Sequence, residues 1–282
     1  MPADHNPSSH AAARSWSEDA LTAKSRAVWS AADFHPIARS FAAGAEEFVA
    51  RLALRPGEVV LDVACGTGNL AIPAARAGAR VTGSDIAPNL IAQARIEARA
   101  HGQFIEFDVG DAEQLPYDDG HFETSMTMFG AMFAYRPERA AAELLRVTRR
   151  GGRIAMANWT PDGVIAKLLR AHAAMVPPPA GIPSPLQWGE EAIVRARFGD
   201  RISALTTVKR SIALSFPFAP AGVTELFSKN YGPTLMTLKA LDPTRASQLR
   251  DTIGQVFQAH NIATDGTTTI VGEYLEVVAI VA

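Results

Sequence analysis

Two aspartates and two glycines in this chain stand at the spacing that a nucleotide-binding site requires. Asp62 lies inside the short apolar run 59–63, and Gly66 and Gly68 follow that run directly. A second apolar run ends at Asp85. A strand, a glycine turn and a helix start allow a ligand to lie directly on the backbone, and a carboxylate after the next strand is placed to accept ribose hydroxyls. This segment therefore predicts a bound nucleoside.

The two aspartates also have structural interpretations, which the sequence leaves open. Asp62 could cap the backbone locally, and Asp85 could cap the helical run that starts at Pro88. We favour the ligand site for both. For Asp62 the reason is that a charge within a buried strand needs a partner.

The elements that must position these residues alternate between strand-like and helical patterns. Apolar, β-branched runs predict strands at 59–63, 79–84, 104–108, 122–128 and 153–158. Helical patterns lie between them at 69–77, 88–101 and 136–148, and a turn is expected at 151–152. Strands that alternate with helices predict a parallel sheet with helices on both of its faces.

The region 56–160 is thus the expected ligand-binding core, and the chain before it has a different pattern. Residues 1–17 are polar and are expected to form a disordered tail. Residues 18–55 are predicted to form helices over the ligand cleft.

The pattern changes again beyond the core, where prolines interrupt the alternation. Residues 161–265 are predicted to form a lid on the substrate side, with an edge strand near 202–216 and helices at 220–240 and 243–260. A final strand within 266–282 is expected to pair antiparallel with the edge strand.

Composition excludes several classes of function. The chain has 282 residues and a formal net charge of −2, which gives no broad basic surface for nucleic acid. Its single cysteine, Cys65, cannot build a disulfide framework or a cysteine-based zinc site, and it fits a reducing cytoplasm. No apolar stretch approaches the length of a membrane span. We expect a cytoplasmic protein, monomeric or homodimeric, that binds a small molecule and no metal.

Four sequence blocks occur in a fixed order along the core: 60–68, 81–90, 110–117 followed by Phe122, and 143–153. Together they resemble the class I S-adenosylmethionine-dependent methyltransferases, and within them the small-molecule branch related to the ubiquinone and menaquinone methyltransferases. The resemblance implies an α/β fold, namely a Rossmann-like, doubly wound, seven-stranded sheet. In that fold the sheet is mostly parallel with an antiparallel last strand, and it carries a helical N-terminal segment and helical lid insertions.

The resemblance also implies which residues bind S-adenosylmethionine. Gly66 and Gly68 would let its methionine part lie against the backbone, and Asp62 would hold this loop or reach the ammonium group through water. Asp85 would accept both ribose hydroxyls, a task that suits an acceptor-only carboxylate. The expected cofactor-binding set is Trp29, Asp62, Ala64, Gly66, Gly68, Asp85, Ile86, Asp111, Ala112 and Met128.

The remaining members of that set are assigned to adenine and to the floor of the site. Ile86 would pack on the adenine face, Asp111 would accept the exocyclic amine, and the Ala112 backbone N–H would reach a ring nitrogen. Met128 would form part of the floor, and Trp29 matches a position where relatives place an aromatic ring over the cofactor.

The sequence suggests a second group of residues for the methyl acceptor. The aromatic members of this group could instead be core residues. Its histidine could instead have a structural role or lie exposed on the surface. The candidates are His35, Phe129, Asn158, Trp159, Phe227 and Tyr231. No residue stands out as a general base, so the catalytic residue is left unassigned.

The expected function is in-line transfer of a methyl group from S-adenosylmethionine to a small-molecule acceptor. One alternative is an NAD(P)-dependent oxidoreductase, because residues 66–71 satisfy its loose glycine pattern and Asp85 has suitable spacing for its ribose. The other is a cofactor-binding module without catalysis, because the sequence does not identify the acceptor site.

Overall fold

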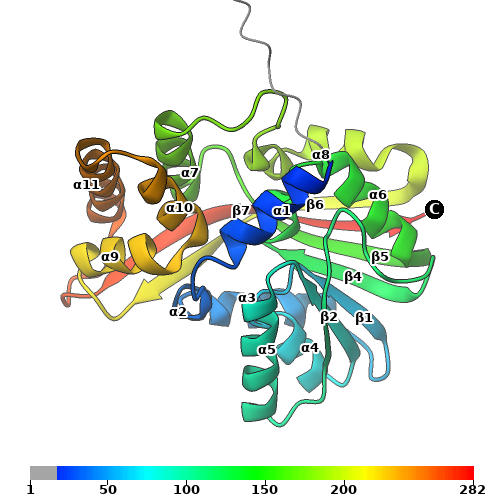
Figure 1. Cartoon of the computed structure of the whole chain (residues 1–282). Helices are drawn as coiled ribbons and strands as arrows, with labels where there is room; N and C mark the ends of the chain where they lie inside the picture. The colour runs from blue at the N-terminus through cyan, green and yellow to red at the C-terminus, as the bar shows by residue number, and fades with distance from the viewer. Residues whose placement is uncertain (1–17) are drawn as a thin grey trace, which may run out of the picture.

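One seven-stranded sheet organises residues 18–282, the part of the chain that the computed structural model describes (Figure 1). The expected disordered tail, 1–17, lies outside the described residues. The strand order is β3-β2-β1-β4-β5-β7-β6. The strands are β1 (Val59–Val63), β2 (Arg80–Asp85), β3 (Glu106–Val109), β4 (Phe122–Met128), β5 (Thr148–Trp159), β6 (Ile202–Phe216) and β7 (Thr268–Val281).

The strand directions are those predicted from the sequence. β1 runs parallel to β2 and to β4, and the pairs β2–β3 and β4–β5 are also parallel. β7 is antiparallel to both of its neighbours, β5 and β6. The predicted mostly parallel sheet with an antiparallel last strand is confirmed, and β6 is the edge strand. In a parallel sheet the carboxyl ends of the strands share one edge, which is where ligands bind.

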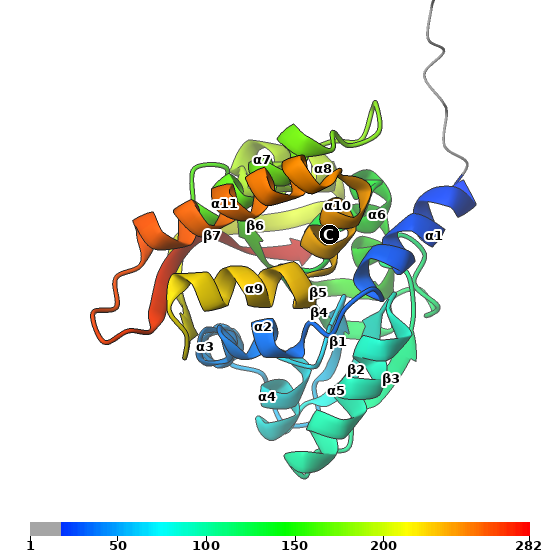
Figure 2. The ribbon, with the colours of Figure 1, turned by 60° about the vertical axis from the view of Figure 1, so that its left-hand side comes forward.

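Helices cover both faces of the sheet, because strands buried on both sides need an apolar layer on each. In Figures 1 and 2, α3 (Ala42–Leu52), α4 (Ala71–Arg76) and α5 (Pro88–Ala100) lie on one face. α6 (Pro137–Val147) and α8 (Glu191–Phe198) lie on the other. α6 shows why its sequence is helical: Ala140, Ala141, Leu144 and Leu145 recur at helical spacing and are all buried.

A second group of helices gathers near the end of the sheet at which β6 ends and β7 begins (Figure 2). It comprises α7 (Val164–Met175), α9 (Pro220–Asn230), α10 (Gly232–Ala240) and α11 (Pro243–His260). The chain begins with α1 (Glu18–Trp29) and α2 (His35–Arg39), and α2 packs against α9. Short 3₁₀ turns lie at η1 (Ala131–Phe133), η2 (Pro185–Gly189) and η3 (Gly199–Arg201). No helix within residues 18–282 combines the length and apolar character needed to cross a membrane.

The edge strand predicted near 202–216 is confirmed as β6. Two other details of the predicted elements are wrong. The turn expected at 151–152 lies inside β5, where the register with β4 shifts between Phe122 and Thr124, so the extra residues form a bulge. The helix expected at 220–240 is split, because the backbone is extended at Tyr231.

Gly232 generates a test of how α10 is docked on α1. A Cβ atom at this position would overlap with the carbonyl oxygen of Val28, next to Trp29. Overpacking against backbone costs about 1–3 kcal/mol. We therefore expect Gly232→Ala to lower the midpoint of thermal unfolding. Gly254→Ala is the matched control. Gly254 lies within helix α11, and a Cβ there would meet only the Thr224 side chain, at 3.3 Å from its hydroxyl. An equal loss in both variants would contradict close α1–α10 packing.

Candidate functional site

The loop after β1 is shaped by backbone that most side chains disfavour. Ala64, Gly66 and Gly68 all have positive φ angles, of 56°, 54° and 94°. A Cβ at Gly66 would meet nothing within 4 Å, so this glycine faces open space. A Cβ at Gly68 would lie 3.2 Å from the Ile72 side chain, so this glycine faces α4 instead. The glycine that leaves room for a ligand is therefore Gly66, and Gly68 serves the turn.

Asp85 connects this loop to the end of β2. Its two carboxylate oxygens accept the backbone N–H groups of Gly66 and Ala87, each at 2.9 Å. The side chain is only 6% exposed. Burial raises the pKa of Asp85 to about 6, although the two N–H donors oppose that shift. Each oxygen keeps a further lone pair, so the carboxylate is still able to accept hydroxyl groups from a ligand.

Asp62 combines the two interpretations that the sequence left open. Its Oδ2 accepts the backbone N–H of Ala71 at 3.0 Å, which caps the start of α4. The same residue lines the cleft described below. Burial raises the pKa of Asp62 well above its ordinary value, and the nearby charge of Asp85 raises it further. A cation in the cleft would relieve this crowding of two buried carboxyl groups.

Asp111 joins the loop after β3 to the first helix. Its Oδ2 accepts the hydroxyl of Thr22 on α1, and its Oδ1 accepts the backbone N–H of Glu113. Arg136 also reaches the Thr22 hydroxyl and pairs with Glu113. This network holds α1, which ends in Trp29, across the carboxyl edge of the sheet (Figure 1).

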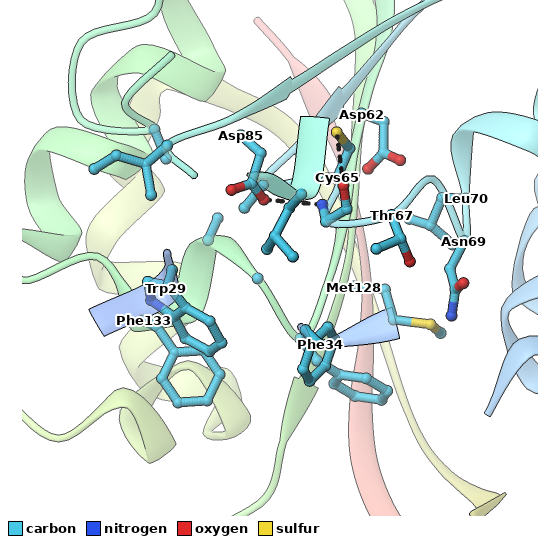
Figure 3. A pocket seen from close by; sticks show the side chains of 18 of the residues that line it. Trp29, Phe34, Asp62, Cys65, Thr67, Asn69, Leu70, Asp85, Met128 and Phe133 are labelled. Carbon is cyan, nitrogen blue, oxygen red and sulfur yellow. Dashed lines mark hydrogen bonds between the residues drawn. The ribbon is translucent and has the colours of Figure 1, made fainter. Parts of the chain in front are cut away.

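These residues surround one cleft of about 900 Å³, including its open mouth, which we call the main cleft. Figure 3 shows Asp62 and Asp85 on one side of it, with the rings of Trp29, Phe34 and Phe133 across from them. The sequence-predicted residues that line it are Trp29, Asp62, Ala64, Gly66, Asp85, Ile86, Asp111, Ala112, Met128 and Phe129. Other lining residues were not predicted as site residues, among them Phe34, Phe41, Cys65, Thr67 and Phe133. The hydroxyl of Thr67 is buried there without a partner among the described residues.

A second cavity of about 490 Å³, including the open space at its mouth, adjoins the main cleft, and we call it the aromatic chamber. Its lining includes the predicted residues Phe129, Trp159, Phe227 and Tyr231. The two cavities share a boundary of five aromatic residues, Trp29, Phe34, Phe41, Phe129 and Phe133. The rest of the chamber wall is Ile37, Ile165, Leu168, Leu169 and Leu214.

Two of the predicted acceptor residues line neither cavity. His35 points to α5, where its Nε2 lies 3.5 Å from Glu97 Oε1. Asn158 is fully buried, with no hydrogen-bond partner for its amide among the described residues. It precedes Trp159 in β5, and successive side chains of a strand point to opposite faces of the sheet. The chamber therefore receives Trp159 and not Asn158.

The boundary between the cavities depends on the conformation of Phe129. This residue follows β4 and has a φ of 54°, a strained value for a bulky side chain. Its ring stacks on Trp159 with centroids 3.5 Å apart, and the edge of Tyr274 packs against it. The next residue must be glycine, because a Cβ at Gly130 would lie 2.6 Å from the Ala64 carbonyl oxygen.

Comparisons with known proteins indicate a methyltransferase. Residues 61–156 match the family model described as a methyltransferase domain. The uncharacterized protein Rv1403c of Mycobacterium tuberculosis is 38% identical over 218 residues, 77% of this chain and 80% of that protein. Demethylmenaquinone methyltransferase of Thermus thermophilus is 37% identical over 123 residues, 42% of this chain and 56% of that enzyme.

A solved structure with the same fold is the geranyl diphosphate C-methyltransferase of Streptomyces coelicolor, in complex with Mg²⁺, geranyl diphosphate and S-adenosylhomocysteine. It superposes with a TM-score of 0.50 and 17% identity, over 85% of this chain and 77% of that one. This chain belongs to the class I S-adenosylmethionine-dependent methyltransferases. Of the two enzyme classes that the sequence left open, the family match supports the methyltransferase over the NAD(P)-dependent oxidoreductase.

The main cleft of this methyltransferase fits S-adenosylmethionine. Gly66 leaves open space where a methionine moiety would lie against the loop, and Asp85 offers a buried carboxylate for a ribose diol. Ile86, expected against the adenine face, and Ala112, whose backbone N–H is expected to reach a ring nitrogen, both line this cleft. Asp62 lines the same cleft, where a cationic ligand would favour the ionised form of its carboxyl group.

Gly66→Ala tests this placement of the methionine moiety. The new methyl group would project into the main cleft, so we expect S-adenosylhomocysteine to bind at least about tenfold more weakly, a loss of roughly 1.4 kcal/mol. Gly102→Ala is the matched control, since its φ is 66° and its Cβ would also meet nothing within 4 Å, but it does not line the cleft. Calorimetry should show an affinity loss in the first variant only. Equal affinities in both would refute the assignment.

The raised pKa of Asp85 predicts how cofactor binding depends on pH. Ribose hydroxyls donate to the ionised carboxylate, and that form is lost as pH falls through about 6. The affinity for S-adenosylhomocysteine should thus fall by about tenfold from pH 7 to pH 5. In Asp85→Asn the affinity should be lower at pH 7 and should lose this pH dependence. Parallel pH profiles for the two proteins would show that Asp85 does not meet the ligand.

Proposed function

We propose that this methyltransferase acts on a small, apolar acceptor that occupies the aromatic chamber. The observation that carries the proposal is the shared boundary: the rings of Phe129 and Trp29 line both the main cleft and the chamber. A ligand in the chamber would therefore meet the methyl-donor end of a cofactor in the main cleft. Ligand sites with mostly apolar and aromatic walls select apolar molecules.

The composition of the chamber supports an acceptor that is flat or chain-like and largely hydrocarbon. No side chain with a formal charge at neutral pH is among the described residues that line it. Stacked and edge-on rings, such as Phe129 against Trp159, favour a planar partner. One relative is named demethylmenaquinone methyltransferase, and a quinone such as the one in its name is compatible with this chamber.

The chain contributes alignment and exclusion of water. Bound S-adenosylmethionine supplies a methyl group that is already activated by the adjacent sulfonium. The protein must hold the acceptor atom in line with that methyl group and keep water out. The five rings that line both cavities are placed for both tasks, because they surround the region where the methyl donor and the acceptor would meet and cover it with apolar surface. Their faces also attract the positive charge of a sulfonium.

The region predicted as a lid contributes to this chamber only in part. Ile165, Leu168 and Leu169 come from α7, Phe227 comes from α9, and Tyr231 follows α9. No residue of the proline-rich stretch 177–185 is among the described residues that line either cavity. We propose that α7 and α9 are the substrate-determining elements.

An acceptor screen tests the proposed function directly. Apolar thiols, phenols, naphthols and quinols should give S-adenosylhomocysteine when incubated with the enzyme and S-adenosylmethionine. Hydrophilic acceptors such as amino acids should not. Turnover of hydrophilic acceptors alone would overturn the proposal, and binding of the cofactor without turnover of any acceptor would favour a non-catalytic module.

Leu169→Phe tests whether the chamber is the acceptor site. The larger ring would fill part of it at a cost of about 1–3 kcal/mol to acceptor binding, which corresponds to an increase in KM of about 5- to 150-fold. The affinity for S-adenosylhomocysteine should stay the same. Leu226→Phe is the matched control, since Leu226 is also a partly buried helical leucine but does not line the chamber. A change in cofactor affinity with an unchanged acceptor KM would place the acceptor elsewhere.

A further inference from the structure

The strand β6 is long for the edge of a sheet. It has 15 residues and pairs with β7 on one side only. Natural sheets usually keep their edge strands short, because a row of unpaired N–H and C=O groups is a template on which another strand can pair. The outer side of β6 is therefore a candidate interaction surface.

Two hydrogen bonds show which backbone groups of β6 point outward. The Ser215 N–H points away from β7, because it donates to the carbonyl oxygen of Ser40 at 2.9 Å. The carbonyl oxygen of Glu273 accepts the Thr160 N–H, so it points away from β6, and its register partner Ser211 must direct its own backbone groups outward. The register has no shift between these points and Ala204. The outward-facing residues are thus Leu205, Thr207, Lys209, Ser211 and Ala213.

The outer edge is open along 205–213. No described residue donates a hydrogen bond to these outward C=O groups or accepts one from these N–H groups. The edge is closed at one end by the Ser40 carbonyl, which occupies the Ser215 N–H, and at the other by the bulge between Ile202 and Ala204. The open segment is long enough for a second strand, and strand addition supplies the missing backbone partners.

The two cations in this segment do not block pairing. Charged side chains on an edge usually discourage another strand. Here Lys209 Nζ lies 3.5 Å from a carboxylate oxygen of Glu273, and Arg210 Nε lies 2.9 Å from one of Glu276. Both carboxylates belong to β7, so each cation is held over a face of the sheet and away from the open edge.

A second copy of β6 is a partner whose pairing can be specified residue by residue. When two identical edges pair antiparallel, outward residues face outward residues, and the two-fold axis passes through one residue. An axis at Lys209 or Arg210 would oppose two like cations. An axis at Thr207 would bring together two copies of Glu191, which accepts the Thr207 hydroxyl at 2.6 Å. Axes nearer the ends of the segment pair fewer residues, so Val208 is the favoured centre.

With the axis at Val208, the two copies complement each other in apolar contact and in charge. Val208 is 40% exposed and would pack on the partner's Val208 at the centre of the pairing. Lys209 would face the partner's Thr207 and, through it, the partner's Glu191. The axis repeats this ion pair on its other side.

The surface beside this edge has a charge balance that suits a second cation. An open hollow there is lined by three carboxylates, of Asp162, Glu190 and Glu191, and by one cation, that of Lys209. The Lys209 of a second copy would reduce this excess of negative charge.

We propose that this methyltransferase forms a homodimer in which the β6 strands of two copies pair antiparallel about Val208. The sheet would then continue across the two-fold axis. The paired segment 205–211 lines neither the main cleft nor the aromatic chamber, so the homodimer does not depend on the proposed acceptor.

Val208→Cys tests the position of the axis in the full-length protein. The only cysteine in the sequence, Cys65, is buried, so a cross-link would come from the introduced thiol. At the axis the two thiols would belong to a non-hydrogen-bonded pair, whose Cα atoms lie about 4.5 Å apart, within the range of a disulfide. Mild oxidation should give a covalent dimer on a non-reducing gel.

Thr206→Cys is the matched control for this cross-link. Thr206 is an exposed neighbour on the same face of β6, but it would face the partner's Arg210. The two introduced thiols would be offset by four residues, about 14 Å along the strands, which is beyond the reach of a disulfide. This variant should stay uncross-linked.

Val208→Lys tests whether the pairing holds the dimer together. The native protein should have the mass of two chains by light scattering at micromolar concentration. Two like charges at the axis, and the loss of the valine pair, should raise the dimer Kd at least about tenfold. Val271→Lys is the matched control, because Val271 is 44% exposed but lies on β7, away from the open edge. An unchanged affinity for S-adenosylhomocysteine would show that each variant is folded.

Three results would overturn the proposal. A native chain that stays monomeric at high micromolar concentration would exclude the homodimer. A dimer that tolerates Val208→Lys, or one that is weakened equally by Val271→Lys, would not depend on the β6 edge. Cross-linking through Thr206→Cys as readily as through Val208→Cys would exclude the axis at Val208.

Discussion

The close contact between the ends of β1 and β4 is the constraint on which both cavities depend. Ala64 follows β1 and Phe129 follows β4, and each has a left-handed backbone that costs energy outside glycine. Gly130, the residue after Phe129, lies so close to the Ala64 carbonyl oxygen that no side chain fits there. The contact turns the β1 loop toward the main cleft and the Phe129 ring toward the chamber. One local arrangement thereby defines the boundary across which a methyl group would pass.

The two cavities differ sharply in electrostatic character, and this difference suits the chemistry. The main cleft holds two buried carboxyl groups whose pKa values are raised by burial, so it is best satisfied by a ligand with hydroxyl donors and positive charge. The chamber has aromatic and aliphatic walls, which favour an apolar molecule. Methyl transfer removes the positive charge from the cofactor. The carboxyl groups of the main cleft suit the cationic cofactor before the transfer. The apolar chamber excludes water from the acceptor during it.

Cover for the site comes from segments far apart in the sequence. α1 is tied down through Thr22 and Asp111, and its last residue, Trp29, contacts the rings of Phe133 and Tyr231. The N-terminal helices and the helices beyond the core thus meet over the boundary. Since the core sheet presents the cofactor site in a standard way, variation in these covering helices is the route by which such a fold changes its acceptor.

The sequence by itself determined the core and most of the residues that line the main cleft. Strand, glycine turn and helix are local signals, and residues such as Asp62, Gly66 and Asp85 lie at strand ends that local patterns already locate. Parallel strands have their carboxyl ends at the same edge of the sheet. The positions of the strands in the sequence therefore already predict that these residues lie close together. The same reasoning failed for the turn at 151–152, where a bulge absorbs residues that look like a turn.

Tertiary structure alone decided the aromatic chamber, which is the proposed acceptor side. Phe41, Phe133 and Leu214 line the chamber from different parts of the chain, and nothing in their local sequence distinguishes them from core residues. His35 was expected to face the acceptor and faces Glu97 instead. Asn158 was also expected there, but the cavities exclude it. The physical reason is that periodicity fixes which side chains are buried, whereas long-range packing fixes what they are buried against.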